Sequence, residues 1–152
     1  MLNIASGTFI FAEDTRRFLL LLRNRTHKNM WALAGGKSQD QETTYQTILR
    51  ECKEELGFIV AFKKLAPLNY YLSDDQNFNY VTWCGIVQKE FSPKLNDEHA
   101  GYAWVASGCW PKPLHPGVFK CLTDPIFESK LEEFLNYNLP TTTSITPTPL
   151  AV

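Results

Sequence analysis

The first apolar segments of the chain have the composition of β-strands. Ile4–Phe11 and Phe18–Arg23 are short apolar segments on either side of the polar turn sequence Glu13–Arg16. Every position of Phe18–Leu22 is apolar. A strand with one solvated face alternates apolar and polar residues, so this unbroken run predicts a strand that is covered on both faces.

Helical spacing replaces strand spacing between Thr43 and Gly57. Apolar residues here recur at intervals of three and four and form one stripe, which consists of Tyr45, Ile48, Leu49, Cys52 and Leu56. Thr43 followed by Gln46 has the form of a capping box, and Gly57 stands where a helix end favours glycine. The segment is therefore predicted to be a helix that packs one face on a sheet and turns the other toward a cleft.

The rest of the chain predicts further strands and a second helix. Segments with strand composition are Phe58–Phe62, Leu68–Leu72, Tyr80–Gln88 and Tyr102–Ala106. The middle two flank a turn-forming sequence and predict a hairpin, residues 108–117 predict a loop, and Ile126–Asn136 carries a helical stripe. Strands on both sides of one strong helix, with a final helix, predict an α/β fold in which a mixed sheet lies between helices.

Composition sets limits on this picture. The chain has 152 residues, enough for one domain, which we expect at 1–139, followed by a mobile Thr- and Pro-rich tail at 140–152. Fifteen basic and sixteen acidic residues give a net charge of −1, which provides no strong signal for nucleic-acid binding. Four cysteines without metal-binding spacing, no signal peptide and no membrane-spanning apolar run predict a cytoplasmic protein with reduced thiols. We expect a monomer or a homodimer.

Three carboxylates on the predicted helix are the first candidates for chemistry. Glu51, Glu54 and Glu55 are spaced by three and four residues, so a helix places them on one face. Carboxylates that close repel one another, and a divalent cation relieves the repulsion. An all-oxygen site favours Mg²⁺ or Mn²⁺ over zinc. The alternative is a charged helix face exposed to water, which is the common fate of such runs.

The spacing of the whole segment Gly36–Phe58 decides between these interpretations. Gly36, Glu42 and the run RECKEELGF from Arg50 stand at the offsets that define the Nudix box. The chain therefore resembles the Nudix hydrolase family, and the resemblance implies an α/β/α sandwich. Ala34, where the family often has proline, and Cys52, where an aliphatic residue is commoner, depart from the pattern. Neither is a ligand, so we interpret them as changes in loop rigidity and packing.

The resemblance also implies roles for residues in and around the box. The implied metal ligands are Glu51, Glu54, Glu55 and, through its carbonyl, Gly35. Glu42 and Arg50 would brace and orient these ligands. The family often supplies a further acid from a later loop, as a metal ligand or as a base for water, and Glu98 is the candidate with Asp97 as the alternative. The catalytic candidates are thus Glu51, Glu54 and Glu98.

Basic residues near the box are candidates for binding substrate phosphates. They are Arg23 and Arg25, which precede Trp31, and Lys37 in the glycine loop. A solvated connector between two strands explains the first two equally well.

The resemblance implies Mg²⁺-dependent hydrolysis of a phosphoanhydride bond in a nucleoside diphosphate linked to another group. We expect a (deoxy)nucleoside triphosphate pyrophosphohydrolase acting on a small-molecule nucleotide. ADP-ribose and dinucleoside polyphosphates are alternative substrates, and an RNA-cap hydrolase or a noncatalytic nucleotide sensor are further alternatives. A Glu54→Gln variant is predicted to fold normally and to lose most activity.

Overall fold

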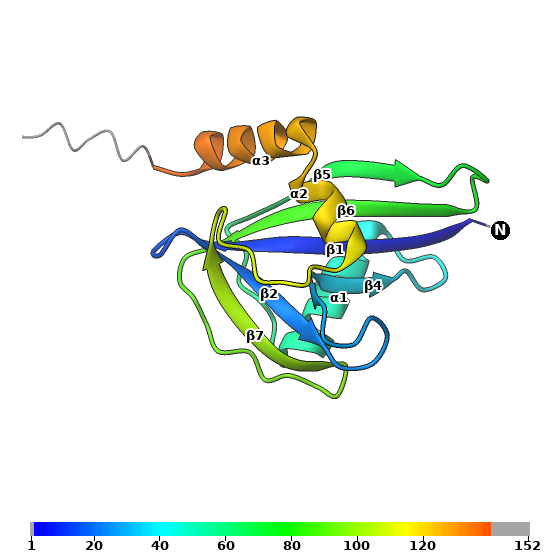
Figure 1. Ribbon diagram of the computed structural model, residues 1–152, viewed down its shortest axis with the longest axis horizontal. Coiled ribbons are helices and arrows are strands. Elements are labelled where there is room, and N and C mark those ends of the chain that lie inside the picture. Colours follow the sequence, from blue (N-terminus) through cyan, green and yellow to red (C-terminus); the bar gives the residue numbers. More distant parts are fainter. Residues whose placement is uncertain (1, 141–152) are drawn as a thin grey trace, which may run out of the picture.

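The computed structural model describes residues 2–140, so the predicted tail lies outside the described residues except for Pro140. The elements in chain order are β1 (Asn3–Ala12), β2 (Arg17–Arg23), β3 (Trp31–Ala32), β4 (Ala34–Lys37), α1 (Thr44–Leu56), β5 (Lys64–Leu72), β6 (Phe78–Val87), β7 (His99–Ala106), α2 (Pro116–Leu122) and α3 (Pro125–Asn138) (Figure 1).

Within the described residues the strands form one mixed sheet around β1. The strand order is β3-β2-β1-β6-β5, with β4 paired to β1 and β7 paired to β2. β1 runs parallel to β6 over its whole length, from Asn3 opposite Phe78 to Ala12 opposite Val87. On its other edge β1 pairs with β2 only near its end, which leaves its beginning free to pair with β4. Gly35 and Gly36 therefore lie beside β1, opposite Gly7 and Ser6.

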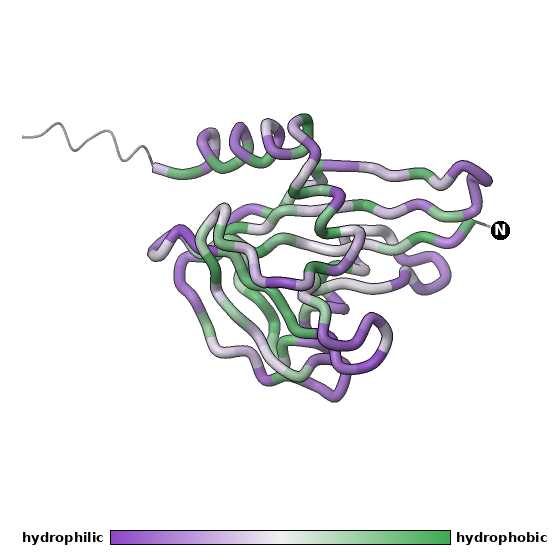
Figure 2. The backbone as a smooth tube through the Cα atoms, viewed as in Figure 1, coloured by the Kyte–Doolittle hydropathy of each residue, from purple (hydrophilic) through white to green (hydrophobic). Residues whose placement is uncertain are grey.

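Helices cover both faces of the sheet. Leu19 and Leu21 of β2 belong to the apolar cluster that includes α1, whereas Phe18 and Leu20 belong to the cluster that includes α2 and α3. The prediction of a strand covered on both faces is thus confirmed, as is the α/β/α arrangement. Figure 2 shows the hydrophobic residues gathered on the central strands, with hydrophilic ones in the connecting loops.

The predicted ends of α1 are confirmed. Thr43 Oγ1 accepts a hydrogen bond from the Gln46 amide at 3.1 Å, and the Thr43 amide donates to Gln46 Oε1 at 2.9 Å. This reciprocal pair satisfies two amides that a helix start would otherwise leave without partners. Gly57 ends the helix in the left-handed conformation, with φ 86°.

The buried face of α1 differs from the predicted stripe. Three residues of the stripe, Ile48, Cys52 and Leu56, are buried as predicted, and Thr47 and Glu55 are buried with them. The other two, Tyr45 and Leu49, are 49% and 38% exposed. Polar contacts explain the difference, because Thr47 bonds to Glu42 and Glu55 bonds to the backbone of β4. Glu55 therefore lies on the packed face of α1, which was predicted to be apolar.

Two predictions for the later chain were also wrong. Residues 58–62 form no strand but cross from α1 to β5, and Phe58 and Phe62 pack against the core under α1. Their apolar character reflects this packing and not a ladder. The loop predicted over 108–117 ends early, because Pro116 begins α2, which His115 caps by accepting a hydrogen bond from the Gly117 amide at 3.0 Å.

Replacing Gly57 by alanine is expected to destabilise the protein more than the same change at Gly108. Both glycines have left-handed φ angles, 86° and 84°, which cost alanine about 1 kcal/mol. A Cβ on Gly57 would also lie 2.6 Å from Lys94 Cβ, whereas one on Gly108 would meet no atom of the described part of the chain within 4 Å. Urea unfolding should show losses of about 1 kcal/mol for Gly108→Ala and at least about 2 kcal/mol for Gly57→Ala. Equal losses would mean that Lys94 moves aside without cost.

Candidate metal centre

Two glycines in β4 let its backbone lie against β1 and α1. A Cβ on Gly35 would be 2.0 Å from the carbonyl oxygen of Ser6, and a Cβ on Gly36 would be 2.3 Å from Glu51 Oε1. A side chain at either position would displace the strand or the carboxylate. The glycines thus bring the α1 carboxylates to the edge of the sheet.

Three carboxylates converge beside this strand. Glu51, Glu55 and Glu98 each place one oxygen within 4.8 Å of the others. The first two come from successive turns of α1, and Glu98 comes from the loop that leads into β7. Glu55 is buried, Glu51 is partly buried and Glu98 is exposed. The cluster therefore has an anchored side inside the protein and an open side toward solvent.

Glu55 is the most constrained member of the cluster. Its Oε1 accepts a hydrogen bond from the Gly35 amide at 3.0 Å, while its Oε2 is buried with no hydrogen-bond partner in residues 2–140. His99 Nδ1 lies 3.4 Å from this second oxygen. Burial raises the pKa of Glu55, and burial followed by the nearby charge of Arg23 lowers the pKa of His99 to about 4. A buried carboxylate oxygen without a donor fits a site that receives a cation.

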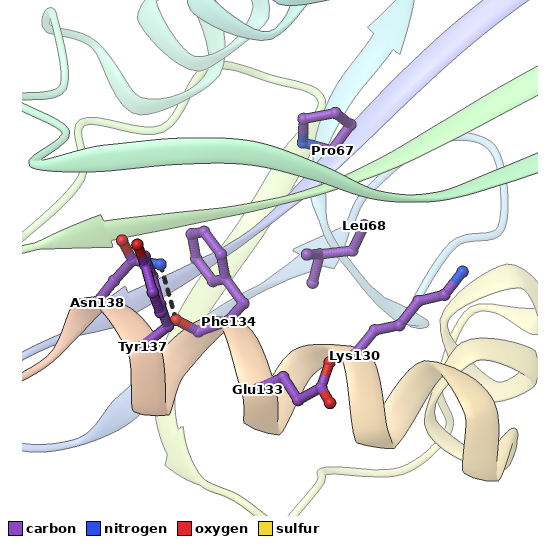
Figure 3. Close-up of a pocket in the computed structure, with 7 residues that line it drawn as sticks. All are labelled: Pro67, Leu68, Lys130, Glu133, Phe134, Tyr137 and Asn138. Atoms are coloured by element: carbon purple, nitrogen blue, oxygen red, sulfur yellow. Dashed lines mark hydrogen bonds between the residues drawn. The ribbon is translucent and has the colours of Figure 1, made fainter.

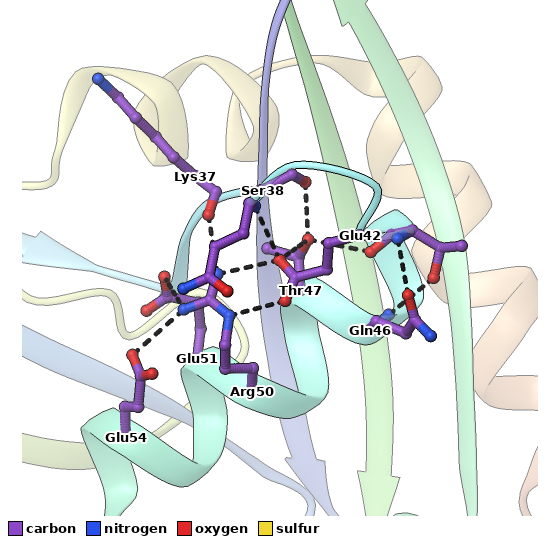
Figure 4. Close-up of polar contacts among 10 residues, drawn as sticks. Lys37, Ser38, Glu42, Gln46, Thr47, Arg50, Glu51 and Glu54 are labelled. Atoms are coloured by element: carbon purple, nitrogen blue, oxygen red, sulfur yellow. Dashed lines mark hydrogen bonds and ion pairs between the residues drawn. The ribbon is translucent and has the colours of Figure 1, made fainter.

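Arg50 ties the cluster to the loop before α1 (Figure 4). Its Nε and Nη2 donate to the two oxygens of Glu42 at 2.7 and 3.0 Å, and its Nη1 donates to Glu51 Oε1 at 3.0 Å. Nη2 also donates to the Lys37 carbonyl at 2.9 Å. A planar guanidinium is suited to this forked arrangement, which holds the Glu51 carboxylate in place. The bracing roles of Glu42 and Arg50 remain predictions, with these contacts in their support.

Glu42 is a strongly stabilised carboxylate. Besides Arg50 it accepts hydrogen bonds from the Gln39 amide at 3.1 Å and the Thr47 hydroxyl at 2.8 Å. The Arg50 hydrogen bonds are the main reason that the pKa of Glu42 falls to about 2. Both of its oxygens are therefore occupied by protein donors.

Acid is expected to weaken the protein partly through Glu42. Its pKa is about 2 in the fold and about 4.3 in an unfolded chain, so the unfolded state binds more protons between these values. The stabilisation, about 2 kcal/mol, is fully present above pH 4.3 and is lost as the pH falls toward 2. Urea unfolding of wild type and Glu42→Gln at pH 7 to 2.5 measures it. The variant should be less stable at pH 7 and should lose less on acidification, whereas the exposed Glu132→Gln on α3 should follow wild type. Parallel curves for Glu42→Gln and wild type would contradict the assignment.

The remaining predicted residues lie around the cluster, not in it. Glu54 is outside the group of converging oxygens found among the described residues; its side chain is 52% exposed and accepts a hydrogen bond from Arg50 Nη1 at 3.2 Å. Asp97, the alternative to Glu98, forms an ion pair with Arg25 at the surface. Arg23 donates to the carbonyl and the hydroxyl of Thr26 at 2.7 and 2.6 Å.

The roles of these outlying residues stay predictions. In Figure 4 the Lys37 side chain extends away from the carboxylates, while its carbonyl accepts from Arg50. His99 was not assigned to the site from the sequence. Because His99 meets Glu55 only where β7 comes near α1, no local spacing pattern could reveal the pair.

Two surface grooves lie away from the carboxylates. The larger, about 550 Å³, runs between β5 and α3 and is lined by Pro67, Leu68, Lys130, Glu133, Phe134, Tyr137 and Asn138 (Figure 3). The other, about 370 Å³, lies along α1 and is lined by Leu49, Arg50, Cys52, Lys53, Ile59, Val60 and Phe62. Neither groove contains a member of the converging cluster, so the chemistry is not placed in them.

Across residues 2–140, every helix is too short or too polar to span a bilayer.

Comparison with known proteins identifies the family of the chain. The family model of the NUDIX domain matches residues 1–117. Dihydroneopterin triphosphate diphosphatase of Escherichia coli K12 is 26% identical over 110 residues, which cover 63% of this chain and 73% of that protein. ADP-ribose pyrophosphatase of Methanocaldococcus jannaschii is 35% identical over 68 residues, which cover 45% of this chain and 39% of that protein. Human nucleoside diphosphate-linked moiety X motif 6 is 34% identical over 59 residues, which cover 39% of this chain and only 19% of the human protein.

Solved structures share the fold. The MutT protein of Methanosarcina mazei Go1 superposes with a TM-score of 0.62 and is 27% identical, covering 86% of this chain and 94% of its own. A Nudix hydrolase of M. smegmatis, RenU, superposes with a TM-score of 0.67 at 18% identity, covering 92% of this chain and 88% of its own. At that identity the second match shows the fold alone.

Proposed function

The chain belongs to the NUDIX family of hydrolases, and from this membership we propose that it is a Mg²⁺-dependent pyrophosphohydrolase of a nucleoside triphosphate or a close analogue. The observation that carries the proposal is the convergence of Glu51, Glu55 and Glu98 within 4.8 Å beside the two glycines of β4. Such an all-oxygen donor set suits Mg²⁺, with Mn²⁺ as a substitute.

The donor set fits a divalent cation for reasons of charge and burial. Glu51 and Glu55 are held from the protein side by Arg50 and the Gly35 amide, at 3.0 Å in each case, and one buried oxygen of Glu55 has no donor among the residues that the structure describes. These two residues and Glu98 would hold the ion, and Glu54 and the Gly35 carbonyl are further proposed ligands. When bound, Mg²⁺ neutralises phosphate charge and lowers the pKa of a nearby water.

The protein's own groups would do the rest of the reaction. The exposed carboxylate of Glu98 would accept a proton from a water molecule. The oxygen of that water would form a bond to phosphorus as the P–O bond of the anhydride breaks and the leaving phosphate departs. Arg50 would keep Glu51 oriented, and Glu42 would keep Arg50 in place. Arg23, Arg25 and Lys37 are the cationic side chains proposed to bind the phosphates. Arg23 has the strongest support, because strand pairing places it opposite His99, the residue that follows Glu98.

A triphosphate substrate is supported by the extent of similarity. Dihydroneopterin triphosphate diphosphatase aligns with 63% of this chain, more than the other two relatives described above. The substrate of that protein carries a triphosphate on a pterin, so we include triphosphates of pterins as well as of purine nucleosides among the proposed substrates.

ADP-ribose is the second candidate. The archaeal ADP-ribose pyrophosphatase is 35% identical over its aligned residues, although these cover only 45% of the chain. Dinucleoside polyphosphates remain a third candidate with the same chemistry. An RNA cap has less support because no basic path is evident at a net charge of −1. A noncatalytic sensor has less support because Glu51, Glu54 and Glu55 are all present.

A substrate panel tests the proposal. Canonical and oxidised nucleoside triphosphates, dihydroneopterin triphosphate, ADP-ribose, dinucleoside polyphosphates and capped RNA are incubated with protein and Mg²⁺, and products are separated by chromatography. The expected result is release of pyrophosphate and a monophosphate from a triphosphate, abolished by EDTA and restored by excess Mg²⁺ or Mn²⁺. Turnover of ADP-ribose or capped RNA alone would replace the substrate assignment, and nucleotide binding without turnover would favour the sensor.

We also propose a cytoplasmic protein with one domain over residues 1–139, either monomer or homodimer. The free cysteines support the location, since Cys52 and Cys84 are buried as thiols and Cys109 is an exposed thiol. Cell fractionation and light scattering of the purified protein test the location and the oligomeric state.

A further inference from the structure

Three buried polar atoms meet between α1 and β7 without hydrogen-bond partners among residues 2–140. They are Glu55 Oε2 and the two ring nitrogens of His99. The side chains are 1% and 2% exposed, and His99 Nδ1 lies 3.4 Å from Glu55 Oε2. Buried polar atoms are nearly always paired, so unpaired ones need a physical explanation. The simplest explanation is that His99 Nδ1 pairs with Glu55 Oε2, and that Glu55 also faces the ion that the carboxylate cluster binds.

The backbone around His99 is held firmly on both sides. Asn96 Nδ2 donates to the Glu54 carbonyl of α1 at 3.2 Å, and Asn96 Oδ1 accepts from the Glu98 amide at 3.0 Å. The Asn24 amide, just after β2, donates to the Glu98 carbonyl at 2.9 Å. One anchored segment therefore supplies exposed Glu98 to the open side of the cluster and buried His99 to its inner side.

We propose that His99 is a positioning residue for the metal centre, which donates its Nδ1–H to Glu55 Oε2 and fixes the plane of that carboxylate. The proposal rests on the proposed metal-dependent function. Glu55 would then be oriented from two elements, by the Gly35 amide at Oε1 and by the imidazole at Oε2. Each carboxylate oxygen has two lone pairs, so both remain able to face a cation.

A positioning role for His99 differs from a packing role and from direct metal binding in the ring nitrogen that matters. A buried imidazole kept only for packing would be replaceable by an apolar side chain of similar size. A direct ligand would act through the outer nitrogen, Nε2. A positioning residue acts through Nδ1, and loss of such a partner typically weakens metal affinity about 10–100-fold.

These three roles can be separated by measuring Mn²⁺ binding to the purified protein without substrate. The free ion is followed by electron paramagnetic resonance. His99→Leu removes both nitrogens. His99→Asn places an amide near the position of Nδ1, whereas His99→Gln places one near Nε2. The expected result is that His99→Leu raises the Kd for Mn²⁺ about 10–100-fold and that His99→Asn, but not His99→Gln, recovers most of the affinity. His27→Leu, which removes an exposed imidazole, should bind as wild type.

Other outcomes overturn the proposal. Wild-type affinity in His99→Leu would assign the residue to packing, and recovery only in His99→Gln would make it a direct ligand. If His99→Leu does not fold, as judged by circular dichroism, the Asn and Gln variants decide alone. Failure of the proposed function is distinguishable: a wild type that binds Mn²⁺ but hydrolyses none of the panel leaves the positioning role standing, whereas a wild type that binds no Mn²⁺ removes both.

Discussion

Glu51→Gln is expected to lower kcat/KM by about a thousandfold or more while leaving the fold intact, a barrier increase of about 4 kcal/mol at ~1.4 kcal/mol per tenfold. The amide removes the negative charge that faces the proposed cation. It keeps an oxygen that can accept the hydrogen bond from Arg50 Nη1, which is 3.0 Å long in the wild type. Kinetics on the best substrate of the panel, together with urea unfolding, separate the loss of activity from any loss of stability.

Glu54→Gln provides the comparison on the same helix. It too is predicted to lose most activity, yet its side chain is 52% exposed and lies outside the converging group defined within the described chain. Glu132→Gln on α3, an exposed acid remote from the cluster, is the matched control and should keep full activity. A nearly normal rate in Glu51→Gln would contradict the proposed metal centre. A nearly normal rate in Glu54→Gln alone would remove only Glu54 from the proposed ligands.

Arg50→Ala is expected to destabilise the protein by about 3–5 kcal/mol, because it leaves carboxylates in a partly buried place without their cation. The Glu42 and Glu51 side chains are each only 12% exposed beside Arg50. Hydrogen bonding to Glu42 raises the pKa of Arg50, so the guanidinium is charged at every accessible pH. Arg50→Lys should recover only part of the loss, since one ammonium cannot form the fork to both Glu42 oxygens. Urea midpoints at pH 7 measure both effects.

A second arginine offers a matched control. Arg17 also forks onto a glutamate, donating to the two oxygens of Glu90 at 2.7 and 2.8 Å, but its side chain is 44% exposed. Exposed pairs of this kind contribute about 1 kcal/mol or less. Arg17→Ala should therefore cost far less than Arg50→Ala. Similar losses at the two positions would show that the Arg50 network is as solvated as a surface pair.

Much of the fold was predictable because local rules act there without competition. The capping box of Thr43 and Gln46 and the left-handed Gly57 set both ends of α1 through contacts between near neighbours. The unbroken run of β2 indicated burial on both faces, which the two apolar clusters confirm. The strand predicted at residues 58–62 was wrong because apolar composition indicates burial and not strand pairing. These residues pack on the core but pair with no neighbouring strand among residues 2–140.

The box residues themselves could be chosen from spacing, but their arrangement could not. Sequence spacing placed Glu51, Glu54 and Glu55 as equals on one helix face. The rotation of α1 on the sheet makes them different: Glu55 faces inward to the Gly35 amide, Glu51 is pinned by Arg50, and Glu54 lies toward solvent. Helix rotation depends on packing against β4, which periodicity within the helix does not record.

By itself the sequence determined the helix that carries the acids, the glycines beside it, the mixed sheet and the family. The helix and its glycines depend on hydrogen bonds, steric limits and apolar spacing among residues near one another in the chain, and the order of strands and helices predicted the mixed sheet. Only the tertiary structure decided that Glu98 joins Glu51 and Glu55, that Arg25 is paired with Asp97, and that His99 lies behind Glu55. Those contacts join elements distant in the chain, and they form because the pairing of β7 with β2 carries the loop before β7 to the face of α1.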